Sequence, residues 1–180
     1  NLLSLINDIL DFSRIESGGI RLLPKPYELA DLLHDLNSMV RFRAEWKGLQ
    51  FSIMIDEDCP AFLFGDSFRI REVILNLLDN AVKYKKADQP IDIYLHTWNE
   101  GNRVCLSVRD TGLGIKKDNL KKIFDKFYRV HTGNVHDVKG FGLGLAYVKK
   151  MVDLHGGTIQ VDSEYGVGTC FTIKLPFLTT

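Results

Sequence analysis

The chain has 180 residues, of which 45% are hydrophobic and 26% charged, and its formal net charge is zero. This is the composition of an ordinary globular protein with enough apolar residues for a core, and the length suits one domain plus a short appendage. The three dispersed cysteines exclude a disulfide framework, and no apolar run approaches the roughly 20 residues needed to span a bilayer.

A helix is predicted over residues 1–17, because apolar side chains recur there at heptad spacing. Its apolar face is broad and needs a bundle partner that so short a segment lacks. Gly18 and Gly19 end the helix. Because the chain starts inside this helix and without Met, we expect it to be a fragment of a longer protein.

The other elements follow from apolar periodicity and turn residues. Helices are predicted at 29–47, 67–85, about 117–126 and 142–155. Strands are predicted at 50–55, 62–64, 91–98, 103–109, 158–162 and 169–175, with 20–28 extended and 129–140 an exposed loop. The order is not a strict βαβ alternation. We therefore expect an α+β two-layer sandwich, a mixed sheet with helices packed on one face, preceded by the short bundle helix.

A polar stripe runs along the helix predicted at 67–85. Glu72, Asn76 and Asn80 are spaced at i, i+4 and i+8, and Lys83 falls close to the same line. Asparagine is a poor residue for the middle of a helix, so two of them call for a reason. Their oxygens can bind a hard cation such as Mg²⁺, and lysine can pair with phosphate. A solvated helix face explains the pattern equally well.

Two glycine-rich segments are candidate ligand loops. Asp110-Thr-Gly-Leu-Gly-Ile115 directly follows a predicted strand, where glycine permits close backbone approach and an aspartate can accept from an amino group. Gly140-Phe-Gly-Leu-Gly-Leu145 leads into a helix, whose free N–H groups favour anions. The second segment is neither a P-loop nor a dinucleotide-binding fingerprint. A plain turn remains open for the first, and the phosphate signal of the second is weak on its own.

An aromatic segment, Ile-Phe-Asp-Lys-Phe-Tyr-Arg at 123–129, lies between these loops, and its aromatic side chains are expected in the core. It belongs to a basic stretch: residues 116–150 contain nine Lys or Arg and three Asp, a net charge of +6. Such a stretch beside a glycine-rich loop suits a polyphosphate ligand. A solvated helical face is about as good an explanation from charge alone.

The order and spacing of these segments resemble the histidine-kinase branch of the GHKL, or Bergerat-fold, ATPases. The matching stretches are NLLDNAVKY at 76–84 (N box), DTGLGI at 110–115 (first glycine box), IFDKFYRV at 123–130 (F box), KGFGLGL at 139–145 (second glycine box) and a terminal glycine-threonine motif at 168–171. LINDILDFSRIESG at 5–18 resembles the second helix of the dimerisation and phosphotransfer hairpin. Residues 1–19 would then belong to that hairpin and residues 20–180 to the catalytic ATP-binding domain.

The resemblance implies a role for each matching residue, with ATP and Mg²⁺ as ligands. Asp110 would bind the adenine amino group, assisted through water by Gly114 and Thr169, and Tyr84 would lie against the nucleoside. The remaining ATP-binding positions would be Asn80, Gly112, Ile115, Lys139, Gly140, Phe141, Gly142, Leu143, Gly144 and Leu145.

Four residues would be catalytic: Glu72, Asn76, Lys83 and Arg129. Asn76 would coordinate Mg²⁺, Glu72 would polarise a water or a metal ligand, and Lys83 and Arg129 would contact phosphate. Residues 129–140 would form a mobile lid over ATP. The implied activity is that of a protein histidine kinase, in which the γ-phosphate passes to a histidine and then to an aspartate of a response regulator.

The resemblance also implies partners and a location. The partners would be the dimerisation and phosphotransfer domain of the same protein, a response-regulator receiver domain and a second copy in a full-length homodimer, with no nucleic acid. The location would be cytoplasmic, with any membrane anchor outside these residues.

The acceptor histidine of such kinases has no match in this chain. The family motif is a histidine, an acid, two further residues and then Ser/Thr-Pro. His136 and Asp137 fit its start, but Gly140 and Phe141 replace the last pair. The other histidines are expected to be structural or exposed: His34, His96, His131 and His155. No zinc site is expected.

Two other functions remain open at this point. A related ATPase of the serine/threonine anti-sigma, gyrase or mismatch-repair kind would lack the 5–18 segment. A docking module that binds nucleotide without activity would carry substitutions at the nucleotide positions, and none is visible.

Overall fold

The computed structural model describes residues 13, 19–86, 89–130 and 142–176, without the side chains of 42–47. Its main sheet has five strands in the order β2 (Gln50–Ile55), β4 (Asp92–Glu100), β5 (Arg103–Asp110), β7 (Gly168–Pro176) and β6 (Thr158–Glu164). β2 is parallel to β4, and the other neighbours are antiparallel, so the sheet is mixed.

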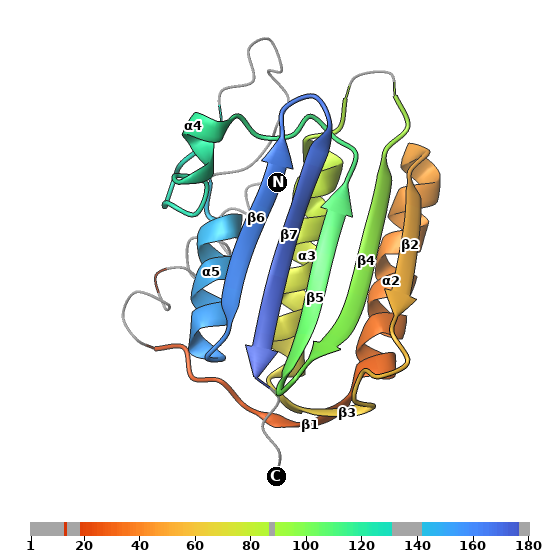
Figure 1. Ribbon diagram of the computed structural model, residues 1–180, viewed down its shortest axis with the longest axis vertical. Coiled ribbons are helices and arrows are strands. Elements are labelled where there is room, and N and C mark those ends of the chain that lie inside the picture. The colour runs from red at the N-terminus through yellow and green to blue at the C-terminus, as the bar shows by residue number, and fades with distance from the viewer. Residues whose placement is uncertain (1–12, 14–18, 87–88, 131–141, 177–180) are drawn as a thin grey trace.

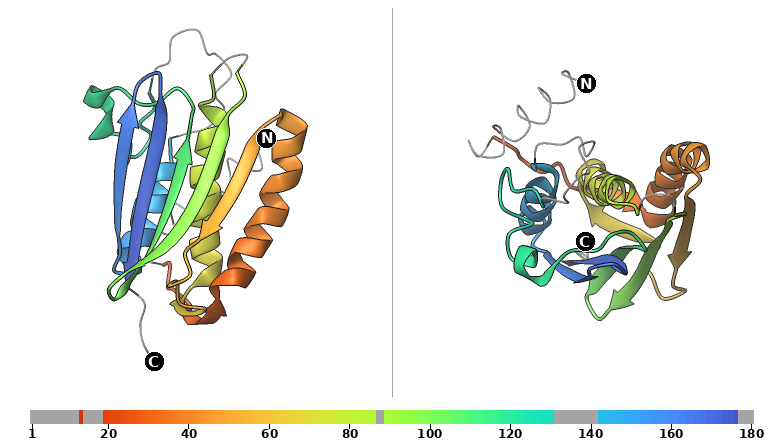
Figure 2. Two further views of the ribbon diagram at one scale, coloured as in Figure 1. Left: turned by 45° about the vertical axis from the view of Figure 1, so that its right-hand side comes forward. Right: turned by 90° about the horizontal axis from the view of Figure 1, so that it is seen from above.

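Three helices pack on one face of this sheet: α2 (Leu29–Lys47), α3 (Ser67–Lys83) and α5 (Gly144–Leu154). Figure 2 shows all three on the same side. The short α4 (Lys117–Leu120) lies near the end of the sheet where β5 finishes and β7 begins (Figure 1). The predicted α+β two-layer sandwich is confirmed.

The core lies between the helices and the inner face of the central strands. Ile74 and Leu77 of α3 and Val148 of α5 are almost completely buried, as are Ile93 and Leu95 of β4. The helix residues recur every three or four positions and the strand residues every two, which is the pattern that hides one face of each element. This packing holds the C-terminal end of α3 close to the ends of β5 and β7.

A second, two-stranded sheet of β1 (Lys25–Glu28) and β3 (Phe62–Gly65) closes the opposite end of the main sheet (Figure 1). Asp66 follows β3 and caps α3, because its Oδ1 accepts from Arg69 N at 3.1 Å. Its other oxygen accepts from Leu23 N at 2.9 Å. One carboxylate therefore fastens the segment before β1 to the start of α3.

The predicted elements agree with these bounds to within a few residues, with one exception. The helix expected at 117–126 stops at Leu120, and residues 121–127 form tight turns. The bonds Lys122 N to Asn119 O and Asp125 N to Lys122 O are of the i to i−3 kind. The turns bury Ile123, so tertiary packing overrides the local helical pattern.

The helix predicted at 1–17 lies outside the described residues except for Ser13, which is helical. The predicted loop at 129–140 is described only at 129–130. Within the described part of the chain, no helix has the length and apolar character needed to cross a membrane.

Candidate active site

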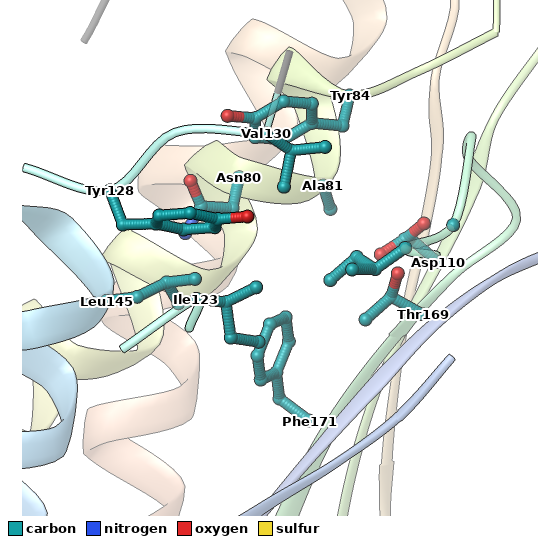
Figure 3. A pocket seen from close by; sticks show the side chains of 12 residues that line it. Asn80, Ala81, Tyr84, Asp110, Ile123, Tyr128, Val130, Leu145, Thr169 and Phe171 are labelled. Carbon is teal, nitrogen blue, oxygen red and sulfur yellow. The ribbon is translucent and has the colours of Figure 1, made fainter. Parts of the chain in front are cut away.

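A cavity of about 70 Å³ opens between the C-terminal half of α3, the ends of β5 and β7, and the segment after α4. Twelve residues line it: Asn80, Ala81, Tyr84, Asp110, Gly114, Ile115, Ile123, Tyr128, Val130, Leu145, Thr169 and Phe171. Figure 3 shows side chains of α3 on one side of the opening, with Asp110 and Thr169 on the other. Segments more than 80 residues apart in sequence thus meet here. Seven of the twelve lining residues are among the site residues predicted from the sequence.

One end of the cavity is built on strand ends. Asp110 and Thr169 face each other in the β5–β7 register, and both are less than 10% exposed. Asp110 Oδ1 accepts from Gly112 N at 2.8 Å. Burial raises the pKa of Asp110 to about 6, while the N–H groups of Gly112 and Thr169 and the charge of Lys86 oppose that rise. A buried carboxylate with spare acceptor capacity is suited to bind an amino group.

The Thr169 hydroxyl belongs to a fixed polar cluster. Ser163 Oγ donates to Gly168 O at 2.9 Å and accepts from Ile115 N at 2.8 Å. Thr169 Oγ1 lies 2.9 Å from Ser163 Oγ. Because the Ser163 proton is already directed at a carbonyl, the Thr169 hydroxyl donates to Ser163 and keeps its lone pairs. The first glycine segment is therefore fastened to β6 and β7.

Gly114 shows why this segment needs glycine. Its φ is +68°, and a Cβ at this position would lie 2.0 Å from Glu164 O. No other residue type could occupy this position without moving the β6–β7 turn. The close approach is between two parts of the protein, and it fixes the loop on which Gly112 and Ile115 lie.

Next to the cavity, the middle of α3 meets the start of α5 at Asn76 and Gly144, neither of which lines it. Asn76 Nδ2 donates to Glu72 O at 2.9 Å, and a Cβ on Gly144 would lie only 3.0 Å from Asn76 Oδ1. The amide oxygen therefore lies against the first turn of α5, where a larger residue would fit only if the Asn76 side chain moved by a few tenths of an ångström. The N-cap residue Leu143 makes no side-chain hydrogen bond to the first N–H groups of α5. An amide oxygen beside a helix N-terminus suits Mg²⁺ and phosphate.

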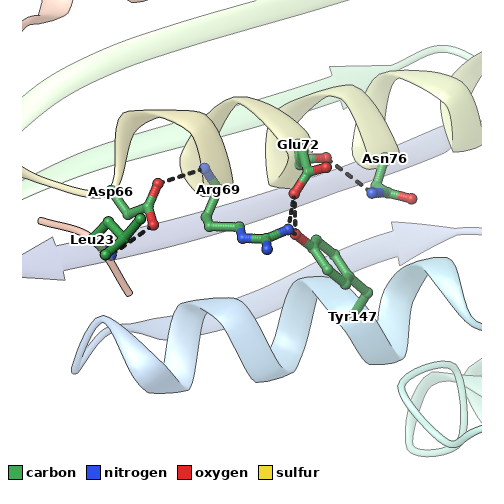
Figure 4. A network of polar contacts seen from close by, with 6 residues as sticks. All are labelled: Leu23, Asp66, Arg69, Glu72, Asn76 and Tyr147. Carbon is green, nitrogen blue, oxygen red and sulfur yellow. Dashed lines mark hydrogen bonds and ion pairs between the residues drawn. The ribbon is translucent and has the colours of Figure 1, made fainter. Parts of the chain in front are cut away.

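Glu72 lies in a network that joins the two helices (Figure 4). Its Oε2 accepts from Arg69 Nη1 at 2.7 Å and from the Tyr147 hydroxyl. Arg69 Nη1 also lies 3.3 Å from the Tyr147 oxygen. Burial and the Glu72 carboxylate raise the pKa of Tyr147. Glu72 thus connects α3 to α5, and it is not among the residues that line the cavity.

The remaining predicted residues are placed as follows. Lys83 is exposed in the last turn of α3 and does not line the cavity. Burial raises the pKa of Tyr84, and the charge of Arg129 opposes the shift, which places Arg129 near the cavity. Gly142 lies next to Leu143 at the start of α5. Lys139, Gly140 and Phe141 lie outside the described residues, as do His131 and His136.

The other three histidines have structural or exposed positions, as expected. His34 is exposed, His96 Nε2 lies 2.8 Å from Asp56 Oδ1, and His155 Nδ1 lies 2.8 Å from Met151 O. Among the described residues, no group of three or more His, Cys, Asp or Glu side chains could hold a metal ion.

Five lining residues were missed from the sequence: Ala81, Ile123, Tyr128, Val130 and Phe171. Phe171 could have been found, because it follows Thr169 by two residues and so shares its face of β7. The prediction that the F-box aromatics are core residues holds for two of three. Phe124 packs edge-on against Phe171, and Tyr128 packs on the core.

Phe127 contradicts that prediction. It is 67% exposed and has a φ of 60°. Its N–H donates to Gly142 O at 3.1 Å. This bond turns the backbone toward α5 and the side chain toward solvent, and it places the F-box beside the second glycine segment.

Comparison with known proteins places this arrangement in a family. The model described as "Histidine kinase-, DNA gyrase B-, and HSP90-like ATPase" matches residues 65–179. The chain belongs to this ATPase family. Within it, sensor protein RprX of Bacteroides fragilis (strain YCH46) is 60% identical over 173 residues, which are 96% of this chain and 33% of RprX. Sensor histidine kinase RcsC of Escherichia coli (strain K12) is 37% identical over 175 residues, which are 97% of this chain and 18% of RcsC.

Solved structures share the fold of this chain. The crystal structure of full-length ShkA in complex with AMPPNP superposes with a TM-score of 0.86 at 33% identity and covers 99% of this chain and 36% of ShkA. Histidine kinase ThkA in complex with response regulator protein TrrA shares the fold, with a TM-score of 0.76 at 21% identity over 98% of this chain and 47% of that one. The chain is a nucleotide-binding domain of the sensor histidine kinase type, and it spans about a third of RprX.

Proposed function

We propose that this domain binds Mg²⁺-ATP and transfers its γ-phosphoryl group to a histidine on a dimerisation and phosphotransfer domain of the same protein. The phosphoryl group then passes to an aspartate of a response-regulator receiver domain. The observation that carries this proposal is a cavity that lies next to a junction of two helices. A buried carboxylate lines the cavity, and at the junction an amide oxygen lies beside a helix N-terminus.

Adenine fits the strand end of the cavity. Its exocyclic amino group donates, and Asp110 accepts. Thr169 keeps lone pairs for a water that serves the ring nitrogen. Guanine carries a carbonyl oxygen where adenine has the amino group, so two acceptors would face each other. An unmet buried polar group costs about 1–3 kcal/mol, so ATP should bind at least roughly tenfold more tightly than GTP.

The triphosphate fits the helix end. The N–H groups at the start of α5 bind phosphate oxygens, and Asn76 Oδ1 lies beside them as a ligand for Mg²⁺. When bound, Mg²⁺ offsets the negative charge that gathers on the phosphate oxygens. We assign Asn80, Lys83 and Arg129 to the phosphates and Tyr84 to the nucleoside face, with the second glycine segment around them.

The transfer itself needs little covalent chemistry from this domain. The acceptor imidazole nitrogen attacks the γ-phosphorus, the bond from that phosphorus to the oxygen bridging to the β-phosphate breaks, and ADP leaves with the electron pair. The domain holds the γ-phosphorus in line with the nitrogen and neutralises charge. Residues 1–19 would be the end of the dimerisation helix and 20–180 the catalytic domain. The parent protein would work as a homodimer in the cytoplasm, with any membrane anchor outside this chain.

A transfer assay with two polypeptides tests the proposal. This chain is mixed with γ-labelled ATP, Mg²⁺ and a separately produced dimerisation domain that carries an acceptor histidine. Label that is stable to base and labile to acid should appear on the dimerisation domain and should not appear on this chain alone. The control is the same dimerisation domain with the acceptor histidine replaced by alanine.

Nucleotide binding is measured in parallel by thermal denaturation. Mg²⁺-ATP should raise the melting temperature by mass action, and Mg²⁺-GTP at equal concentration should raise it less. If the chain binds ATP but transfers no phosphoryl group, the remaining explanation is a docking module that depends on nucleotide. No response to ATP would end the proposal altogether.

A further inference from the structure

A second cavity lies at the other end of the sheet, where β1 and β3 cover the first turn of α3 and the end of α5 (Figure 1). Asp110 and Thr169 pair at the nucleotide end of the β5–β7 ladder, whereas Val104 and Leu175 pair near the opposite end and line this second cavity. Its volume is about 130 Å³, against about 70 Å³ for the nucleotide cavity. The nucleotide site therefore does not account for it.

The walls are apolar apart from two side chains. Ten of the twelve lining residues are glycine, proline or hydrocarbon side chains, and the other two are Tyr27 and His155. A smaller hollow of about 20 Å³ shares Ile70 and Leu175 with this cavity, and all seven of its lining residues are apolar. The core at this end is therefore underpacked in the space between α3, α5 and the sheet.

His155 leaves one polar atom unmet in this wall. Its Nδ1 lies 2.8 Å from Met151 O, and a carbonyl can only accept, so Nδ1 is the donor. In the neutral ring Nε2 is then an acceptor, and it is buried without a hydrogen-bond partner among the residues that the structure describes. The adjacent ring carbon, Cδ2, would lie 3.7 Å from a Cβ placed on Gly65, which also lines the cavity.

Water alone is a poor occupant of this space. A buried water makes about three hydrogen bonds and takes about 30 Å³. The walls offer two side-chain polar groups for a volume of about 130 Å³. An engineered cavity of about 150 Å³ with apolar walls binds benzene, so the space here suits a ring of about six carbon atoms. The unmet acceptor adds a requirement for one donor on that ring.

We propose that this cavity binds a small, mostly apolar molecule carrying one hydroxyl group, of the phenol or six-carbon alcohol class. Its hydroxyl donates to His155 Nε2, and its hydrocarbon body fills the space beneath Leu22 and Pro24. The segment that holds these residues is fastened to α3 through the bond from Leu23 N to Asp66. The ligand thus lies between that segment and both helices of the nucleotide site.

Nuclear magnetic resonance titration of the 180-residue chain with phenol tests this proposal. The amide signals of Gly65 and His155 should shift and saturate, and those of Gly112 and Gly144 should not. Toluene has the same shape but no hydroxyl donor, and it should bind about tenfold more weakly because Nε2 stays unmet.

Two variants separate the parts of the proposal. Gly65→Ala places a Cβ 3.4 Å from Ile70 Cδ1 and 3.6 Å from Tyr27 Cε1, which are ordinary contacts, so the variant should fold. The methyl group takes space from the cavity and should weaken phenol binding at least about tenfold. His155→Phe removes the acceptor and should make phenol and toluene bind equally.

The exposed Ser38→Ala is the control and should bind phenol as the wild type does. Three results would overturn the proposal: no saturable shift at Gly65 and His155, equal binding of phenol and toluene to the wild type, or undiminished binding to Gly65→Ala. If His155→Phe does not fold, the Gly65→Ala and toluene results still decide the outcome.

Discussion

The strand end and the helix end of the candidate site are built differently. At the strand end, Asp110 and Thr169 lie on paired strands, are almost buried and are held by hydrogen bonds to neighbouring residues. At the helix end, Asn76 and the first turn of α5 meet where two helices pack, and Lys83 is exposed. The strand end is complete before a ligand arrives, whereas the helix end presents charges and dipoles to an anion.

From this difference we expect the two ends to serve different functions, base selection at the strand end and phosphoryl transfer at the helix end. A preformed, desolvated acceptor selects one base, because a wrong base leaves a buried group unmet. Helix N–H groups and cations attract any polyphosphate but become decisive when charge moves during transfer. Changes at the strand end should therefore alter affinity and base selection, and changes at the helix end should alter the rate of transfer.

The largest effect is expected at the helix end, from Asn76→Ala. This change removes the oxygen that lies against Gly144, and alanine favours the helix, so the fold should remain. Loss of a metal ligand should lower phosphotransfer by about a hundredfold or more, with little change in nucleotide affinity measured without Mg²⁺.

The two-polypeptide transfer assay, combined with calorimetry in the presence and absence of Mg²⁺, measures both quantities. Asn37→Ala in α2 is the matched control for an Asn-to-Ala change in a helix. Unchanged transfer by Asn76→Ala would remove this residue from the metal site.

Asp110→Asn should have the next largest effect, at the strand end. It keeps the shape of the side chain, removes the charge and turns one acceptor into a donor that faces the adenine amino group. Affinity for ATP should fall about tenfold to a hundredfold, and the preference for ATP over GTP should shrink. Calorimetric titration measures both nucleotides, and circular dichroism confirms folding.

Asp162→Asn supplies the control for this change, because Asp162 is exposed on β6. It should bind ATP as the wild type does. Wild-type affinity in folded Asp110→Asn would show that Asp110 does not read the base.

A change of pH should act on the same end with a smaller effect. The pKa of Asp110 is about 6 in the folded protein against 3.8 for a free side chain. Between pH 7 and pH 5 the ionised fraction falls from about nine-tenths to about one-tenth, so ATP affinity should fall about tenfold. The phosphates of ATP also titrate in this pH range. The change in ATP affinity that Asp110→Asn shows between the same two pH values is therefore subtracted as the baseline.

The stability of the ligand-free protein should change in the opposite direction. The raised pKa means that the folded state takes up a proton before the unfolded state does as the pH falls. The contribution of Asp110 to the free energy of unfolding therefore rises as the pH falls from above 6 toward 3.8. Denaturant unfolding of wild type and Asp110→Asn at both pH values measures this difference. An equal pH dependence in the two proteins would contradict the raised pKa.

Sequence reasoning predicts the strand end better than the helix end, and the reason is physical. The β4–β5 hairpin that ends at Asp110 follows from period-two patterns and a local turn. Nothing local connects Glu72 with Tyr147, which lies 75 residues away, so their bond cannot be read from the sequence. The turns at 121–127 form for the same reason, because burial of Ile123 is decided by distant neighbours.

The cavity near His155 shows the same limit. The apolar pattern of each segment that lines it gives no sign of a cavity. The space exists only because of the way β1 and β3 pack over the ends of β5 and β7. Packing defects between elements have no signature in the periodicity of any single element.

The smallest effect is expected from Tyr147→Phe, which tests how the two helices are held together behind the phosphate end. The change removes the hydroxyl that donates to Glu72, but Arg69 still pairs with that carboxylate at 2.7 Å. The side chains of Arg69 and Glu72 are 22% and 29% exposed, so solvent weakens the bond and the loss should be about 1 kcal/mol. The melting temperature should then fall by about 2–4 °C, with ATP affinity unchanged. Lys174→Gln, which breaks the exposed pair with Glu100, should leave the melting temperature unchanged. If Tyr147→Phe instead keeps its melting temperature and loses phosphotransfer, the network serves the reaction and Glu72 acts on a water or metal ligand, as the family resemblance implies.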